Sequence, residues 1–229
     1  MKELDTSLVE GLHILFNEWG MQCASYWPVL PTQGLVYKPP ADQVAQKMIR
    51  TIGITEYQRL ITYILKLSSR DDHKKLIKSL GSPSEDFCFF YLTAAYNLLA
   101  ASWKTIESIE LGEILIQNLF LFGLPWRAVY LLQVLCIPIE EVIRVWGKLI
   151  NHEKWIIREN AVGFVYELFY PQNGGDLFTV SNSQWQQFYD TLQERSAIET
   201  EPEIRHLLKR ITLIVQRRLN SDAPPDRAG

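Results

Sequence analysis

The chain has 229 residues, of which 47% are hydrophobic and 21% are charged, so it can form an ordinary packed core. This composition excludes a disordered protein, a collagen-like protein and a highly charged coiled coil. The formal net charge of −3 has the wrong sign for a general nucleic-acid-binding surface. Cys23, Cys88 and Cys136 stand far apart and are odd in number. They favour a reducing, cytoplasmic compartment over a disulfide-stabilised secreted domain.

Neither the N-terminus nor the apolar runs predict membrane targeting. Glu10 and His13 interrupt the first apolar stretch, which argues against a signal peptide. Two apolar runs without a charge, 87–103 and 114–126, have 17 and 13 residues. A spanning helix needs about 20 mainly apolar residues, so we expect no membrane span and interpret both runs as buried helices.

Hydrophobic residues recur with the period of an α-helix along almost the whole chain. Leu8, Leu12 and Leu15 mark the first amphipathic helix, which extends to Trp19. In chain order, further helices are predicted at about 41–52, 55–68, 71–81, 84–102, 106–122, 125–136, 139–151, 154–170, 183–197 and 202–219. Strand patterns are nearly absent. The sequence therefore predicts an all-α fold in one domain, residues 1–220.

Residues 20–40 differ in character from the flanking helices. They contain four prolines and two glycines, which forbid a regular helix. They also contain five large apolar or aromatic side chains: Tyr26, Trp27, Leu30, Val36 and Tyr37. We expect an extended, proline-rich strap packed over the first helices; the alternative is a docking segment in which Tyr26 and Trp27 bind a partner. The tail, 221–229, is predicted to be disordered.

An internal similarity links residues 139–168 with residues 185–219. In each segment a helix and a polar turn are followed by an Ile-Arg pair, Ile157-Arg158 and Ile204-Arg205. The two arginines are 47 residues apart, within the spacing of helical repeat arrays. This pattern resembles the HEAT repeat, whose second helix typically begins with Val-Arg and has alanine three residues later. Ala161 occupies that position in the first segment and Leu208 in the second.

The resemblance departs from the HEAT pattern at the turns, where Asn151 or His152 and then Glu199 replace the usual aspartate. Upstream, only Met48-Ile49-Arg50 gives a faint further copy. The resemblance implies that each arginine joins adjacent repeats through a carboxylate or a turn carbonyl. It also implies short, stacked antiparallel hairpins of a HEAT-like α-solenoid over residues 139–219, the alternative being a compact helical bundle.

No pattern in the sequence predicts a catalytic, cofactor or metal site. Glu203 and His206 have the spacing of one half of a di-iron motif, but such sites need two pairs and further glutamates. No histidine lies in a zinc motif, and phosphate-binding and nucleophile-elbow motifs are absent from the sequence. The sequence therefore favours a protein without enzymatic activity.

A row of basic residues marks the predicted helix 71–81. Arg70, Lys74 and Lys78 recur at four-residue steps on one helical face. Such a row could bind phosphate or an acidic partner. The alternative is a solvated face on which Asp71 pairs with Lys75.

Three functions remain open. The first is a non-catalytic scaffold that binds a protein partner through a helical-repeat surface. The second is nucleic-acid binding, because Trp155 and Arg158 at a helix start are similar to the groove residues of HEAT-like DNA alkylation-repair glycosylases. In that reading Trp155 stacks on bases, although a tryptophan at a hairpin turn more often fills the core, and the sequence favours that interpretation of Trp155. The third is a helical bundle with an apolar ligand pocket around 87–135.

Overall fold

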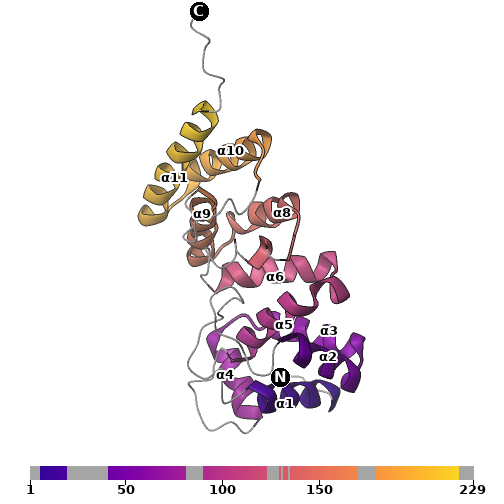
Figure 1. The fold of residues 1–229 in the computed structure, drawn as a ribbon. Coiled ribbons are helices and arrows are strands. Elements are labelled where there is room, and N and C mark those ends of the chain that lie inside the picture. The colour runs from indigo at the N-terminus through magenta and orange to yellow at the C-terminus, as the bar shows by residue number, and fades with distance from the viewer. Residues whose placement is uncertain are drawn as a thin grey trace, which may run out of the picture. The chain divides into compact units, whose positions relative to one another are not determined.

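The computed structural model of the protein describes residues 6–19, 41–80, 90–122, 129, 131–133, 135–169 and 179–221. All regular secondary structure in these ranges is helical, and they contain no β-strand. The all-α prediction is therefore confirmed (Figure 1).

The helices follow the predicted ones closely. They are α1 (Thr6–Trp19), α2 (Ala41–Ile52), α3 (Ile54–Leu65), α4 (Arg70–Ser79), α5 (Phe90–Ile106), α6 (Ile109–Leu121), α8 (Ile139–Leu149), α9 (Trp155–Phe169), α10 (Asn182–Ile198) and α11 (Pro202–Ser221). The largest error is at α5, which ends at Ile106 and not near residue 102. The predicted strap at 20–40, with Tyr26 and Trp27, lies outside the described residues, as do half of the predicted helix 125–136 and nearly all of the tail.

The chain divides into two compact units, Met1–Ile114 and Leu115–Gly229. The sequence analysis did not predict this division. In the N-terminal unit, α1, α2, α3 and α5 all contact one another. Their shared core contains fully buried aliphatic side chains, among them Leu12, Leu15, Met48, Leu60 and Ile61. A Cβ atom on Gly11 would lie 2.8 Å from Leu60 Cδ2, so any larger residue there would force the ends of the packed side chains of α3 to shift.

Helix α4 begins with a well-formed cap. Ser69 Oγ accepts a hydrogen bond from the backbone N–H of Asp72 at 3.1 Å, which satisfies one of the free amides of the first turn. On the next residue, His73, the imidazole is completely buried. Burial is the main cause that lowers the pKa of His73 to about 4, against smaller opposing effects of Asp72 and of a backbone hydrogen bond with Leu67.

The C-terminal unit contains two helical hairpins that lie side by side. Helix α8 contacts α9 and α10, and α11 contacts α9 and α10 (Figure 1). Trp146 of α8 is buried at the centre, where its indole N–H donates to the carbonyl of Ala161 in α9 at 2.8 Å. Its ring meets that of Phe188 in α10 edge-on, with centroids 4.7 Å apart. One tryptophan therefore joins both hairpins.

No helix in the described ranges has the length and hydrophobicity that crossing a membrane requires. The uncharged run 87–103 instead contributes to α5, in which Tyr91, Leu92, Leu98 and Leu99 are buried. Two polar side chains of this helix are satisfied locally, since Asn97 donates to the carbonyl of Thr93 and Ser102 to that of Leu98. The interpretation of this run as a buried helix is confirmed from residue 90 onward.

Helix α10 starts with a capping box. Ser181 Oγ accepts from the N–H of Gln184, and Gln184 Oε1 accepts from the N–H of Ser181 at 2.8 Å. We expect Ser181→Ala to lower the free energy of unfolding by about 1 kcal/mol, because the helix loses its N-terminal acceptor. Urea denaturation measures this loss, with Gln187→Ala on the exposed side of the same helix as control. Equal stability of the two variants would contradict the prediction.

Candidate functional site

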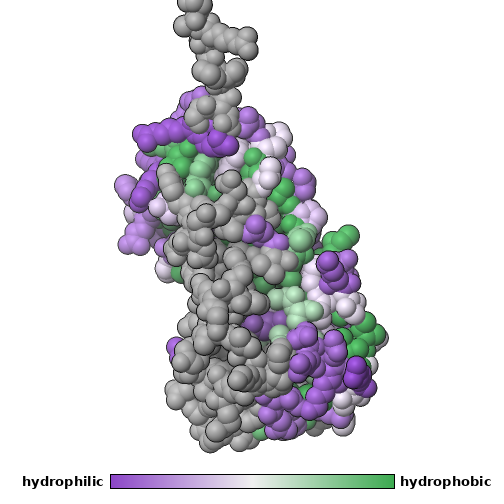
Figure 2. Space-filling view, viewed as in Figure 1, coloured by the Kyte–Doolittle hydropathy of each residue, from purple (hydrophilic) through white to green (hydrophobic). Residues whose placement is uncertain are grey.

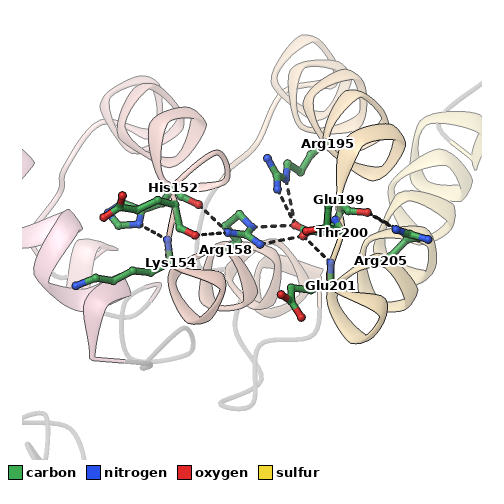
Figure 3. A network of polar contacts seen from close by, with 9 residues as sticks. His152, Lys154, Arg158, Arg195, Glu199, Thr200, Glu201 and Arg205 are labelled. Carbon is green, nitrogen blue, oxygen red and sulfur yellow. Dashed lines mark hydrogen bonds and ion pairs between the residues drawn. The ribbon is translucent and has the colours of Figure 1, made fainter.

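Arg158 and Glu199 join the turns of the two C-terminal hairpins. Arg158 lies in the first turn of α9, and Glu199 follows the last residue of α10. Arg158 Nε donates to Glu199 Oε2 and Arg158 Nη2 to Glu199 Oε1, both at 2.9 Å (Figure 3). The exposed fractions are only 5% for Arg158 and 2% for Glu199, so this two-pronged ion pair is shielded from water.

The remaining donor group of Arg158 binds the turn of its own hairpin. Arg158 Nη1 donates to the carbonyls of His152 at 2.9 Å and Glu153 at 2.8 Å (Figure 3). One guanidinium thus holds the turn between α8 and α9 against the turn between α10 and α11. The inter-helix contact expected for Arg158 is confirmed: it joins the next hairpin through the carboxylate of Glu199, whereas the carbonyls it binds belong to the turn of its own hairpin.

The carboxylate of Glu199 is saturated with donors. Besides Arg158, Arg195 donates to Oε2 at 3.0 and 3.1 Å, and the N–H groups of Thr200 and Glu201 donate to Oε1 at 2.9 and 3.0 Å. The hydrogen bonds from Arg158 are the main cause that lowers the pKa of Glu199 to about 2, although burial opposes them. The group is therefore ionised at neutral pH.

Arg205, the second arginine of the internal similarity, has a related but smaller role. It donates to the backbone carbonyl of Glu199 from Nε at 2.9 Å and from Nη2 at 2.6 Å. Arg205 thus fixes the turn of its own hairpin, as Arg158 does for the preceding one. It is exposed and forms no carboxylate pair within the described residues.

Exposed apolar side chains flank these joined turns along the chain. Trp155, the first residue of α9, is 50% exposed, and Ile156 is 40% exposed. Ile198, the last residue of α10, is 64% exposed and directly precedes Glu199. Trp155 lies three residues before Arg158, hence on the same side of α9. We call Trp155, Ile156 and Ile198 the turn-end surface.

The other predicted site residues lie elsewhere. Arg70 and Lys78 are exposed and Lys74 is partly exposed on α4, which belongs to the N-terminal unit. Glu203 and His206 are both exposed, and no group of side chains in the described part of the chain is arranged to hold a metal ion.

Sequence reasoning missed Arg195, Ile156 and Ile198. The four-residue spacing of Arg195 and Glu199 on α10 could have predicted their ion pair. The two isoleucines carry no such signal, because an exposed isoleucine has the same place in a hydrophobic pattern as a buried one.

The charged groups of the joined turns bond to one another: Arg158, Arg195 and Arg205 all donate to Glu199. These bonds fix the two turns, which in turn support the neighbouring exposed side chains. No protein-family model, curated protein or solved structure matches the chain.

Proposed function

We propose that the protein is a non-catalytic scaffold that binds a protein partner at the turn-end surface. The observation that carries this proposal is the position of Trp155, half exposed and three residues before an arginine whose side chain is fixed by the next hairpin. Exposed tryptophans on rigid supports dominate the energetics of protein interfaces, because little side-chain entropy is lost on binding.

The proposal includes a HEAT-like arrangement of the C-terminal unit. Two features support it: α8 contacts α10 while α9 contacts α11, and Arg158 bonds to the turn of the following hairpin. In stacked repeats each hairpin buries one face on its neighbour and leaves the turns free for binding. The odd number of cysteines, one of them the exposed thiol of Cys136, supports a reducing cytoplasmic location.

A protein partner is favoured over nucleic acid by the state of Arg158. A DNA-binding groove would need this guanidinium to face a phosphate, but Glu199 and two carbonyls occupy its donors. The nearby charges are also mixed in sign, with exposed Lys154 beside exposed Glu153 and with exposed Glu201 in the second turn.

The test is a selection of displayed random peptides on the full chain, followed by affinity measurements with purified peptides. We expect Trp155→Ala to lower the affinity for the selected peptides tenfold or more, because removal of an interface hot spot costs about 2 kcal/mol or more of binding free energy. Ile109→Ala is the matched control, since Ile109 is 77% exposed but belongs to the N-terminal unit.

Two outcomes would reject this function. In the first, Trp155→Ala leaves the affinity of every selected peptide unchanged. In the second, a duplex of about 20 base pairs binds the wild-type chain at near-physiological salt and the same substitution abolishes that binding. The second result would establish the nucleic-acid alternative.

A further inference from the structure

Helix α11 has a buried apolar face and a basic outer face. Ile204, Leu208, Ile211 and Val215 are buried where the helix packs against α9 and α10. The helix carries five Lys or Arg residues and one Glu, a formal charge of +4 in a chain whose net charge is −3. Hydrophilic side chains accordingly prevail over α11 in the space-filling view, beside a smaller apolar area (Figure 2).

The outer face forms a continuous stripe. His206, Arg210, Leu213 and Arg217 are exposed and follow one another at steps of three or four residues, with exposed Lys209 alongside. Leu213 at the centre of the stripe is 54% exposed. We call these five residues the basic face of α11. From His206 to Arg217 it extends about 17 Å, or roughly three helical turns.

Within the described residues, the cations of this face are not neutralised by ion pairs, and one of them, Arg210, is held in position by an aromatic ring. The guanidinium of Arg210 lies over the ring of Tyr166 in α9, 5.8 Å from its centroid. Within the part of the chain that the structure describes, Lys209 and Arg217 take part in no ion pair. A ligand with carboxylates could therefore pair with Lys209 and Arg217 without breaking an ion pair inside the described part of the protein.

We propose that the basic face of α11 binds an acidic amphipathic helix of a partner protein. Charge complementarity identifies the partner: carboxylates three and four residues apart on one helix match the spacing of Lys209, Arg210 and Arg217. Leu213 supplies the apolar centre and the cations the polar rim that protein interfaces have. This surface shares no residue with the turn-end surface, so the inference is independent of the proposed function.

The same features disfavour nucleic acid at this face. A phosphate backbone gains nothing from an exposed leucine in the middle of the cations. The neighbouring helix α10 also exposes Asp190 and Glu194, which repel the evenly spaced charges of a phosphate backbone more than a few carboxylates that lie only opposite the cations of α11. A short helix bearing carboxylates and leucines can use the basic residues and avoid the acidic ones.

The experiment uses the full chain and a fluorescein-labelled peptide of about 18 residues, with leucines and glutamates spaced for one amphipathic helix. Fluorescence anisotropy measures binding at about 50 and 200 mM salt. We expect Lys209→Glu/Arg217→Glu to weaken binding tenfold or more and Leu213→Ala about threefold. Lys75→Glu/Lys104→Glu changes the net charge equally at exposed sites in the N-terminal unit and should leave binding within twofold.

Circular dichroism first verifies that each variant is folded. Three results would overturn the inference: a peptide of the same composition with scrambled spacing binds equally well, the two double variants weaken binding equally, or the peptide does not bind. Tighter binding of a DNA oligonucleotide that is lost in Lys209→Glu/Arg217→Glu would assign the face to nucleic acid instead. Trp155→Ala should leave peptide binding unchanged, so this test and that of the turn-end surface can fail separately.

Discussion

Replacing Arg158 with alanine is expected to lower the free energy of unfolding by about 3 kcal/mol or more, because it breaks a buried ion pair from one side. The carboxylate of Glu199 would remain buried, and within the part of the chain that the structure describes it would keep only Arg195 and two backbone N–H groups as donors. The carbonyls of His152 and Glu153 would also lose their shared donor.

Urea denaturation of the full chain measures this loss. Arg144→Ala is the matched control, because Arg144 pairs with Glu141 on an exposed surface of α8 and such pairs contribute at most about 1 kcal/mol. Arg158→Lys should fall between wild type and Arg158→Ala, since an ammonium group cannot reproduce the forked geometry. A loss of only a few tenths of a kcal/mol for Arg158→Ala would mean that the arginine does not join the hairpins.

Acidification is expected to destabilise the protein through His73 before it affects Glu199. The pKa of His73 is about 4 in the folded chain and about 6.5 when unfolded, so the unfolded state binds the proton more tightly. The neutral imidazole therefore contributes its full stability above about pH 6.5, and this contribution is lost as the pH falls toward 4. The corresponding decrease between pH 7 and 4.5 is about 2 kcal/mol.

The measurement is the free energy of unfolding at pH 7 and at pH 4.5, for wild type and for His73→Gln. Glutamine does not titrate, so the variant should be less stable at pH 7 but should lose about 2 kcal/mol less on acidification. Glu199, whose pKa is about 2, loses its stabilising effect only below about pH 4.5 and does not contribute to this window. Parallel pH profiles for the two proteins would show that the imidazole is not the responsible group.

The helices could be predicted from the sequence because nearly all of them bury one face at a regular period. Their ends were less predictable. Ser102 was expected to lie at the end of its helix, but its hydroxyl donates to the carbonyl of Leu98 inside the helix, and α5 continues to Ile106. The Ser102 hydroxyl also forms a hydrogen bond with the hydroxyl of Tyr57 in α3 at 2.9 Å. This bond depends on the tertiary fold and could not be predicted from the local sequence.

At the candidate site, the sequence identified Arg158 and named Glu199 as the acidic residue of the second turn. That the two bond to each other follows from the contact of α9 with α11, which periodicity does not specify. For Trp155 the sequence favoured a core position, as Trp185 has near the start of α10, but this was wrong because Trp155 is 50% exposed. Only the packing of neighbouring helices decides which tryptophan is left at the surface.

The position of Glu199 has a further consequence for local motion. Its carboxylate binds the amides of Thr200 and Glu201 just before α11 and, at the same time, a guanidinium on α9. Moving Glu199 away from α9 when the start of α11 opens would break its bonds to the other hairpin, which couples fraying at this point to both hairpins. The two hairpins should open and close as one cooperative unit, with slow amide exchange shared across both.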